Sequence, residues 1–235
     1  MVKNKVNNKK TGQKIGNIRK NRKLIQIKNK ITKKNLILAS QSPRRKELLE
    51  QAGVDFKIVP ANIEEIIGAF ERAEDYVMRL SREKALHVAQ KYPGEWVIGA
   101  DTTVVMGDAI LEKPLSEDDA RKMLETLSGR SHIVYTGFTI CRKTDLAGRD
   151  SGIQAEEKLI TSSVRTDVLF KTLTASEIDW YIGTGEPFDK AGSYAIQGLG
   201  TFMVRSINGS YSNVVGLPVC EVMEILAKEG IIEMT

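Results

Sequence analysis

Strand-like and helix-like segments alternate along this chain, and that order restricts its fold more than any other feature of the sequence. Apolar, β-branched patterns predict strands at 36–39, 55–59 and 96–106, and helical spacing predicts helices at 43–52, 73–91 and 117–127. Later elements are two long strands at 131–141 and 158–171, a helix from the Thr174-x-x-Glu177 capping box to Gly183, a strand at 201–207 and a helix begun by Pro218. We therefore expect an α/β fold around a mixed sheet, in two lobes with a cleft between them.

Charge divides the chain into two parts. Residues 1–34 hold 13 of the 35 Lys and Arg residues and no Asp or Glu, so the remainder, which carries all 30 acidic residues, is net negative. We expect 1–34 to be a disordered basic extension and 35–235 to be the folded domain. The extension leaves open a targeting role, a weak tether to nucleic acid or membrane surfaces, and a passive role. An acidic body argues against a dedicated nucleic-acid surface on the domain.

Several classes of protein lack support in the sequence. Cys141 and Cys220 stand apart from each other and from the two histidines, so neither a zinc site nor a Cys–His nucleophile pair is indicated. No P-loop or Gly-x-Ser-x-Gly elbow occurs. No apolar run approaches 18 residues and no signal peptide is evident, so we expect a cytoplasmic protein without a membrane partner.

The turn between the first strand and the first helix has an unusual charge. Ser42 is a good N-cap and Pro43 fits the first helical position, yet Arg44 and Arg45 follow where the helix dipole favours acidic residues. A phosphate chain bound by the free N–H groups and both guanidinium groups would offset that repulsion. The alternative is two solvated arginines on an ordinary capped helix.

Two buried charges and a glutamate pair are the next candidates. Lys84 falls in the middle of the apolar face of helix 73–91, where it must snorkel, the commoner outcome, or meet an anion. Asp101 interrupts an apolar strand and needs a metal, a cation or several hydrogen bonds, while Gly99 leaves room for a ligand near the backbone. Glu64 and Glu65 follow the second strand and could add carboxylates to the same site.

Seven ordered motifs resemble the Maf family of nucleoside triphosphate pyrophosphatases over about residues 36–228. They are Leu-Ala-Ser-Gln-Ser-Pro-Arg-Arg, Ser-Arg-Glu-Lys-Ala, Gly-Ala-Asp-Thr-Thr-Val, Leu-Glu-Lys-Pro, Leu-Ser-Gly-Arg-Ser-His, Gly-Glu-Pro-Phe-Asp-Lys-Ala-Gly-Ser-Tyr-Ala-Ile-Gln-Gly and Val-Val-Gly-Leu-Pro. The resemblance implies an elongated fold related to inosine triphosphate pyrophosphatases. It also implies hydrolysis of nucleoside triphosphates to monophosphate and pyrophosphate with a divalent cation, Mg²⁺ or Mn²⁺.

The resemblance also assigns roles by position. Asp101 matches the catalytic proton acceptor. The positions matched to substrate binding and choice are Ser40, Ser42, Arg44, Arg45, Lys84, Thr102, Lys113 and Gln197. A metal would be held by Asp101 with Glu64 or Glu65, and the sequence does not separate that role of Asp101 from direct proton transfer.

The Ile-Gln-Gly element ending at Gly198 favours the branch that acts on dTTP and UTP; the alternative is the branch that acts on 7-methyl-GTP. A second alternative is a cell-division regulator or nucleic-acid-binding protein that uses the basic extension. The expected partner is a nucleoside triphosphate, with a homodimer left open and nucleic acid bound only weakly through the extension.

Overall fold

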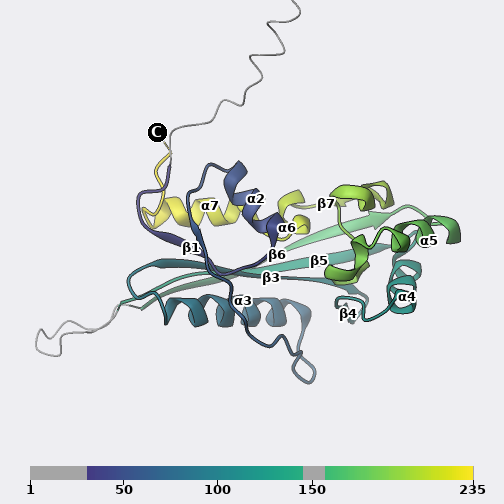
Figure 1. Ribbon diagram of the computed structural model, residues 1–235, viewed down its shortest axis with the longest axis horizontal. Helices are drawn as coiled ribbons and strands as arrows, with labels where there is room; N and C mark the ends of the chain where they lie inside the picture. The colour runs from purple at the N-terminus through teal and green to yellow at the C-terminus, as the bar shows by residue number, and fades with distance from the viewer. Residues whose placement is uncertain (1–30, 145–156, 235) are drawn as a thin grey trace, which may run out of the picture. The chain divides into compact units, whose positions relative to one another are not determined.

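The computed structural model describes residues 31–144 and 157–234, and a mixed sheet of seven strands runs through them (Figure 1). The strands are β1 (Leu36–Leu38), β2 (Lys57–Ile58), β3 (Trp96–Met106), β4 (Ala109–Leu111), β5 (Ser131–Lys143), β6 (Glu157–Phe170) and β7 (Val204–Asn208). Their order is β2-β1-β3-β5-β6-β7, with β4 paired to β3. Strand β1 is parallel to both neighbours and the other pairs are antiparallel. The predicted mixed-sheet α/β fold is confirmed.

Helices cover both faces of the sheet. They are α2 (Pro43–Gln51), α3 (Ala73–Ala89), α4 (Glu117–Leu127), α5 (Ala175–Gly183), α6 (Tyr211–Val215) and α7 (Val219–Lys228), with 3-10 turns η1 (Glu186–Asp189), η2 (Ala191–Ser193) and η3 (Gly198–Met203). Figure 1 shows α3 on one face and α2, α6 and α7 on the other, with α4 and α5 toward one end of the sheet. The predicted caps are present: the Ser116 side chain accepts from the Asp119 N–H, and Thr174 and Glu177 form a capping box.

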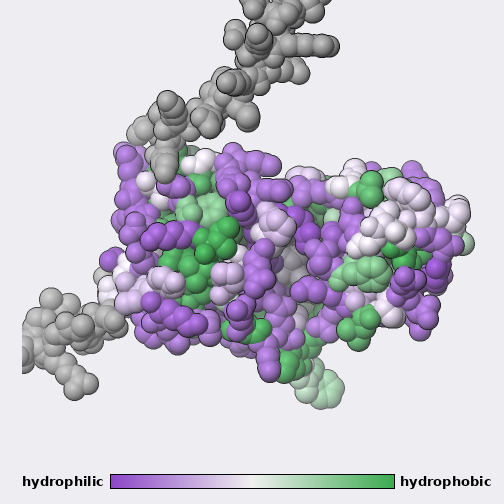
Figure 2. Space-filling view, in the orientation of Figure 1, coloured by the Kyte–Doolittle hydropathy of each residue, from purple (hydrophilic) through white to green (hydrophobic). Residues whose placement is uncertain are grey.

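Two hydrophobic cores divide the face opposite α3. One contains Leu49 of α2 and Leu226 of α7 with the β1 end of the sheet; the other contains Leu124 of α4 and Tyr181 of α5 with the β6 end. The predicted two lobes correspond to these cores. Their outer surfaces are largely hydrophilic, and hydrophobic residues form small separate areas on the face shown in Figure 2.

The edge of β3 is only partly covered. Strand β5 pairs with β3 along residues 96–105 on one edge. On the other edge β1 pairs at 96–98 and β4 at 104–106, so no strand of the described residues pairs with 99–103 there. Because successive side chains of a strand point to opposite faces, this gap lets residues from both faces of the sheet reach one opening.

Helix α3 lies very close to the sheet at two glycines. A Cβ at Gly99 would be 2.3 Å from the Ser81 carbonyl oxygen, and one at Gly137 would be 2.3 Å from the Val77 carbonyl oxygen. The space at Gly99 is therefore filled by α3 and not by a ligand, so that interpretation of the sequence is wrong. The close packing brings the middle of α3 within side-chain reach of β3.

Other differences from the sequence prediction are local. Strand β4 and helix α6 are short elements that were not predicted, and 201–203 belong to η3, so that the following strand begins at Val204. Residues 31–34 are tied to the C-terminal segment by a Thr32–Ile232 bridge and a Lys33–Glu233 ion pair, so the folded unit begins at Ile31 and not at residue 35. Residues 1–30, which form most of the basic extension, and residues 145–156 lie outside the described residues.

Candidate active site

A cleft of about 990 Å³ opens at the uncovered edge of β3. Its lining comes from the β1–α2 turn, the loop before α3, the middle of β3, the loop after β4, the η1–η3 region and the end of α6. The volume lies at the upper end of the range for pockets that enclose small ligands. All eleven residues predicted for catalysis, substrate binding or metal binding line this cleft: Ser40, Ser42, Arg44, Arg45, Glu64, Glu65, Lys84, Asp101, Thr102, Lys113 and Gln197.

Lys84 joins two carboxylates on the α3 face of the sheet. Its Nζ lies 2.7 Å from Asp101 Oδ1 and 2.6 Å from Glu65 Oε1. Lys84 and Asp101 are both 6% exposed, so the lysine meets anions inside the protein and the snorkelling alternative is wrong. A buried charge that is paired and hydrogen-bonded avoids most of the penalty of leaving water.

Glu65 is the more exposed member of this cluster. Burial opposes its ionisation, but the hydrogen bond and charge of Lys84 outweigh burial, and the pKa of Glu65 lies below its ordinary value. Tyr76 of α3 lines the cleft beside them, and burial followed by the charge of Asp101 raises the pKa of its phenol. The phenol thus remains a neutral hydrogen-bonding group at physiological pH.

Arg45 is held on the opposite face of the sheet. Its Nε donates to the Gly216 carbonyl oxygen at 2.8 Å, and its terminal nitrogens donate to Ser40 Oγ and Thr102 Oγ1, both at 3.1 Å. Burial lowers the pKa of this guanidinium, although the charges of Asp101 and Glu65 act in the opposite direction. Arg45 is therefore not a solvated surface residue. Three of its N–H groups donate to protein oxygens, so only its remaining N–H groups are available to an anion.

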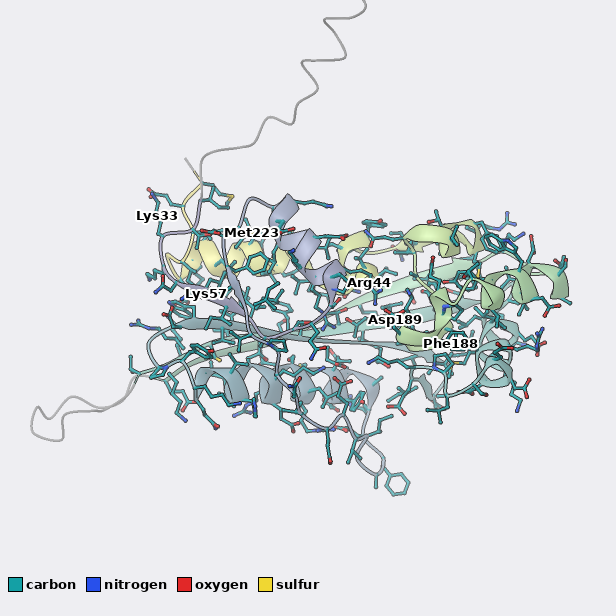
Figure 3. The ribbon with its side chains drawn as sticks, in the orientation of Figure 1. Lys33, Arg44, Lys57, Phe188, Asp189 and Met223 are labelled. Atoms are coloured by element: carbon teal, nitrogen blue, oxygen red, sulfur yellow. The ribbon has the colours of Figure 1, made fainter. Side chains whose placement is uncertain are left out.

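Arg44 of α2 lies across the cleft from the second lobe, the one that contains α4 and α5. Its guanidinium is 3.5 Å from the Asp189 carboxylate of η1, and Figure 3 shows the two side chains near each other from α2 and η1. Burial opposes ionisation of Asp189, but Lys190 and Arg44 keep its pKa below the ordinary value. The pair connects the two lobes at the cleft.

The remaining predicted residues have simpler surroundings. Ser42 Oγ accepts from the Arg45 N–H at 3.5 Å as the N-cap of α2. Glu64, Lys113 and Gln197 line the cleft without a further contact that defines their roles. Glu65 and Asp101 come together through Lys84, but no group of three His, Cys, Asp or Glu side chains with metal-binding geometry occurs among residues 31–144 and 157–234.

The sequence did not indicate Tyr76 as a cleft residue, and it indicated Glu112, Asp189 and Lys190 only as members of the family motifs, without a role of their own. The Tyr76 phenol is 3.4 Å from Glu112 Oε1, and Lys190 donates to the Asp189 carboxylate. Glu112 is adjacent to Lys113, and Asp189 and Lys190 belong to the same motif as Gln197, which was the available signal. No sequence signal pointed to Tyr76, because an aromatic residue on the apolar face of a helix is usually part of the hydrophobic core.

Charge in the cleft is balanced. Five basic residues (Arg44, Arg45, Lys84, Lys113, Lys190) and five acidic residues (Glu64, Glu65, Asp101, Glu112, Asp189) line it. A cation that enters with a polyanion would reduce the repulsion between that polyanion and these carboxylates.

Comparisons with known proteins match most of the chain. A family model described as Maf-like protein matches residues 35–229. A dTTP/UTP pyrophosphatase of Geotalea uraniireducens (strain Rf4) is 51% identical over 201 residues, 86% of this chain and 98% of the relative. One from Syntrophus aciditrophicus (strain SB) is 48% identical over 195 residues, 83% of this chain and 90% of the relative. A solved HAM1 protein from Coxiella burnetii is much more distant. It is 11% identical in sequence, the match covers 83% of this chain and 100% of that protein, and the TM-score is 0.40. No helix among the described residues is long and apolar enough to cross a membrane.

Proposed function

Since the chain belongs to the Maf family, we propose that it is a nucleoside triphosphate pyrophosphatase that hydrolyses dTTP and UTP to the monophosphate and pyrophosphate. The observation that carries this proposal is the cleft at the open edge of β3. It places the Lys84-bound carboxylate of Asp101 and the guanidinium groups of Arg44 and Arg45 around a single cavity. Relatives named dTTP/UTP pyrophosphatase, about half identical in sequence and matched over nearly their whole length, support the choice of substrate.

Asp101 is the residue we assign to the reacting centre. Hydrolysis adds water at a phosphorus atom, breaks the bond between the α- and β-phosphoryl groups and releases a proton. Lys84 donates to Asp101 Oδ1 and holds the carboxylate in a fixed position, from which it can accept that proton. The cationic side chains Arg44, Lys113 and Lys190 lie where they can stabilise charge on the phosphoryl oxygens and on pyrophosphate as it leaves.

A divalent cation fits the residues of the cleft. Mg²⁺ is commonly held by one or two carboxylates together with substrate phosphates, and Asp101 and Glu65 offer two carboxylates on either side of one ammonium group. The five acidic residues of the lining would also repel a triphosphate less if a cation accompanied it. When bound, the cation would polarise the phosphoryl oxygens and lower the pKa of its bound water.

We assign base recognition to Gln197 and to apolar residues of the cleft. Gln197 carries an amide that can both donate to and accept from a uracil or thymine edge, and Ile196, Val214 and Val215 supply apolar surface beside it. A site that pairs its polar groups with the correct base rejects a base that would leave those groups unpaired.

A nucleotide panel tests the proposal. UTP, dTTP, CTP, ATP, GTP, ITP and 7-methyl-GTP are compared by kcat/KM with Mg²⁺ or Mn²⁺, and pyrophosphate is detected through added inorganic pyrophosphatase. We expect UTP and dTTP to be the best substrates, with no phosphate released when the coupling enzyme is omitted. Preference for 7-methyl-GTP or ITP, or direct release of phosphate, would overturn the assignment.

A further inference from the structure

Glu186 does not line the cleft, yet its carboxylate accepts three hydrogen bonds, two of them from the turn that directly follows the cleft residue Gln197. Oε1 lies 3.0 Å from the Tyr181 hydroxyl and 3.2 Å from the Gly200 N–H, and Oε2 lies 3.0 Å from the Leu199 N–H. Hydrogen bonds to an ionised acceptor are about twice as strong as neutral ones. Burial, followed by the charge of Glu186, raises the pKa of the Tyr181 phenol, so Tyr181 remains a donor. This carboxylate is therefore a firm attachment point between α5, η1 and η3.

The contacts of Glu186 fix the chain immediately after Gln197. Gln197 is the N-cap of η3, but its side chain makes no capping hydrogen bond, and the first N–H groups of a helical turn lack acceptors of their own. Glu186 supplies those acceptors. Gly198 adopts a left-handed conformation with φ of 69°, and a Cβ there would lie 2.9 Å from Glu186 Oε2. Thr201 closes the turn from the other side by donating to the carbonyl oxygens of Ile196 and Gly198.

The main chain of Glu186 has a separate contact on the phosphate side. Its carbonyl oxygen accepts from Lys190 Nζ, and Lys190 lines the cleft beside Asp189, which faces Arg44 (Figure 3). A side-chain substitution at Glu186 keeps this carbonyl. A substitution of the Glu186 side chain can therefore change the turn after Gln197 while the hydrogen bond from Lys190 to the Glu186 carbonyl oxygen remains.

We propose that Glu186 is a positioning residue for base selection, and that its carboxylate sets the place of Gln197 by capping the turn that follows it. The inference rests on the proposed function, in which Gln197 meets the base. Uracil presents an N3–H donor and an O4 acceptor where cytosine presents the reverse, so discrimination between them depends on an amide held in one position. If the turn is loosened, Gln197 can adapt to either base, and binding of the correct one also weakens.

Glu186→Gln is the test, because it keeps the shape of the side chain and replaces one accepting oxygen by an amide NH₂ that faces an N–H donor. We expect kcat/KM for UTP to fall about tenfold, the loss that corresponds to about 1.4 kcal/mol, mainly through KM. The ratio of kcat/KM for UTP over CTP should fall at least about fivefold. Inhibition by tripolyphosphate, which has no base, should stay within about twofold of wild type because the Lys190 contact is intact.

Glu177→Gln is the matched control. Glu177 is also a hydrogen-bonded carboxylate of the second lobe, accepting from the Thr174 N–H at 2.9 Å and from Lys171, but it belongs to the cap of α5 and is not a cleft residue. It should lower thermal stability without changing the UTP to CTP ratio. Tyr181→Phe removes only one of the three donors to Glu186 and should shift the ratio in the same direction by a smaller factor.

The outcomes separate the two proposals. A wild-type protein that does not prefer UTP over CTP refutes the proposed function itself. If wild type prefers UTP, then an unchanged ratio in Glu186→Gln, or an equal change in Glu177→Gln, overturns the role of Glu186. Should Glu186→Gln fail to fold, Tyr181→Phe decides: a ratio equal to wild type contradicts the inference.

Discussion

Replacing Lys84 by Met should destabilise the protein by an amount that depends on pH. The side chains of Lys84 and Asp101 are only 8% and 9% exposed, and the ammonium group is the hydrogen-bond donor to Asp101 Oδ1 at 2.7 Å. Methionine keeps the length and helix preference of lysine but leaves the carboxylate buried without its cation. Glu65 loses the same partner, although its side chain, 39% exposed, remains in contact with water.

Proton uptake by Asp101 limits the part of the destabilisation that depends on pH. Removing one partner of a buried ion pair typically costs about 3 to 5 kcal/mol. A stranded aspartate can instead bind a proton, which costs about 1.36 kcal/mol for each pH unit above about 3.9. Protonation of Asp101 therefore adds at most about 4 kcal/mol at pH 7 and about 1.5 kcal/mol at pH 5 to the destabilisation by Lys84→Met. The sign follows from linkage: the folded variant binds an extra proton, so its stability relative to wild type falls as pH rises.

Urea denaturation of wild type, Lys84→Met and Lys84→Met/Asp101→Asn at pH 5 and pH 7 measures this difference. In the double variant asparagine needs no proton, so most of the pH dependence introduced by Lys84→Met should disappear. Asp101→Asn alone should cost less than Lys84→Met, because Lys84 keeps Glu65 as a partner. A destabilisation by Lys84→Met that is equal at the two pH values would refute the reasoning.

Three further predictions concern packing, a buried histidine and the cation. Gly99→Ala should lower the free energy of unfolding by about 1 to 3 kcal/mol and reduce turnover, because a methyl group 2.3 Å from the Ser81 carbonyl oxygen must displace α3 and with it Lys84. Gly183→Ala is the control in the denaturation and kinetic assays, because a Cβ at Gly183 would have no atom within 4 Å. His132 is 2% exposed, and burial lowers its pKa to about 4. The stability that depends on neutral His132 is therefore complete above pH 6.5 and is lost as pH falls toward 4, by about 3 kcal/mol in total. In His132→Gln the free energy of unfolding should depend less on pH between about pH 7 and 4.5, and an equally steep dependence would contradict this. Chelation of divalent cations should abolish UTP hydrolysis, and turnover in EDTA equal to that with Mg²⁺ would show that the balanced charge of the cleft needs no cation.

Sequence patterns located the reactive residues but not the contacts between them. Lys84 and Asp101 each stood out because a charge in an apolar pattern is costly, and both lie in the cleft. Their pairing depends on how closely α3 approaches β3, which two glycines decide through tertiary packing at Gly99 and Gly137. No periodicity in the sequence reports that distance.

Arg45 shows a second limit. A basic residue in the first turn of a helix indicated an anion, but its guanidinium is largely occupied by Ser40, Thr102 and the carbonyl oxygen of Gly216, a residue distant in sequence. Sequence patterns did not predict the turns η1–η3, because their order comes from single side chains such as Glu186 and from glycines with positive φ. Such interactions leave no periodic pattern.

Turnover of UTP by Asp101→Asn tests the central assignment most directly. The substitution keeps the size of the side chain and removes the charge, with Asp167→Asn on β6, paired to Arg165 outside the cleft, as the control. Circular dichroism establishes that the variant is folded, and calorimetry with a non-hydrolysable UTP analogue measures binding. We predict that kcat falls at least about 100-fold in Asp101→Asn while the fold is intact. Near-normal turnover in the folded variant would contradict the account and reduce Asp101 to a structural partner of Lys84.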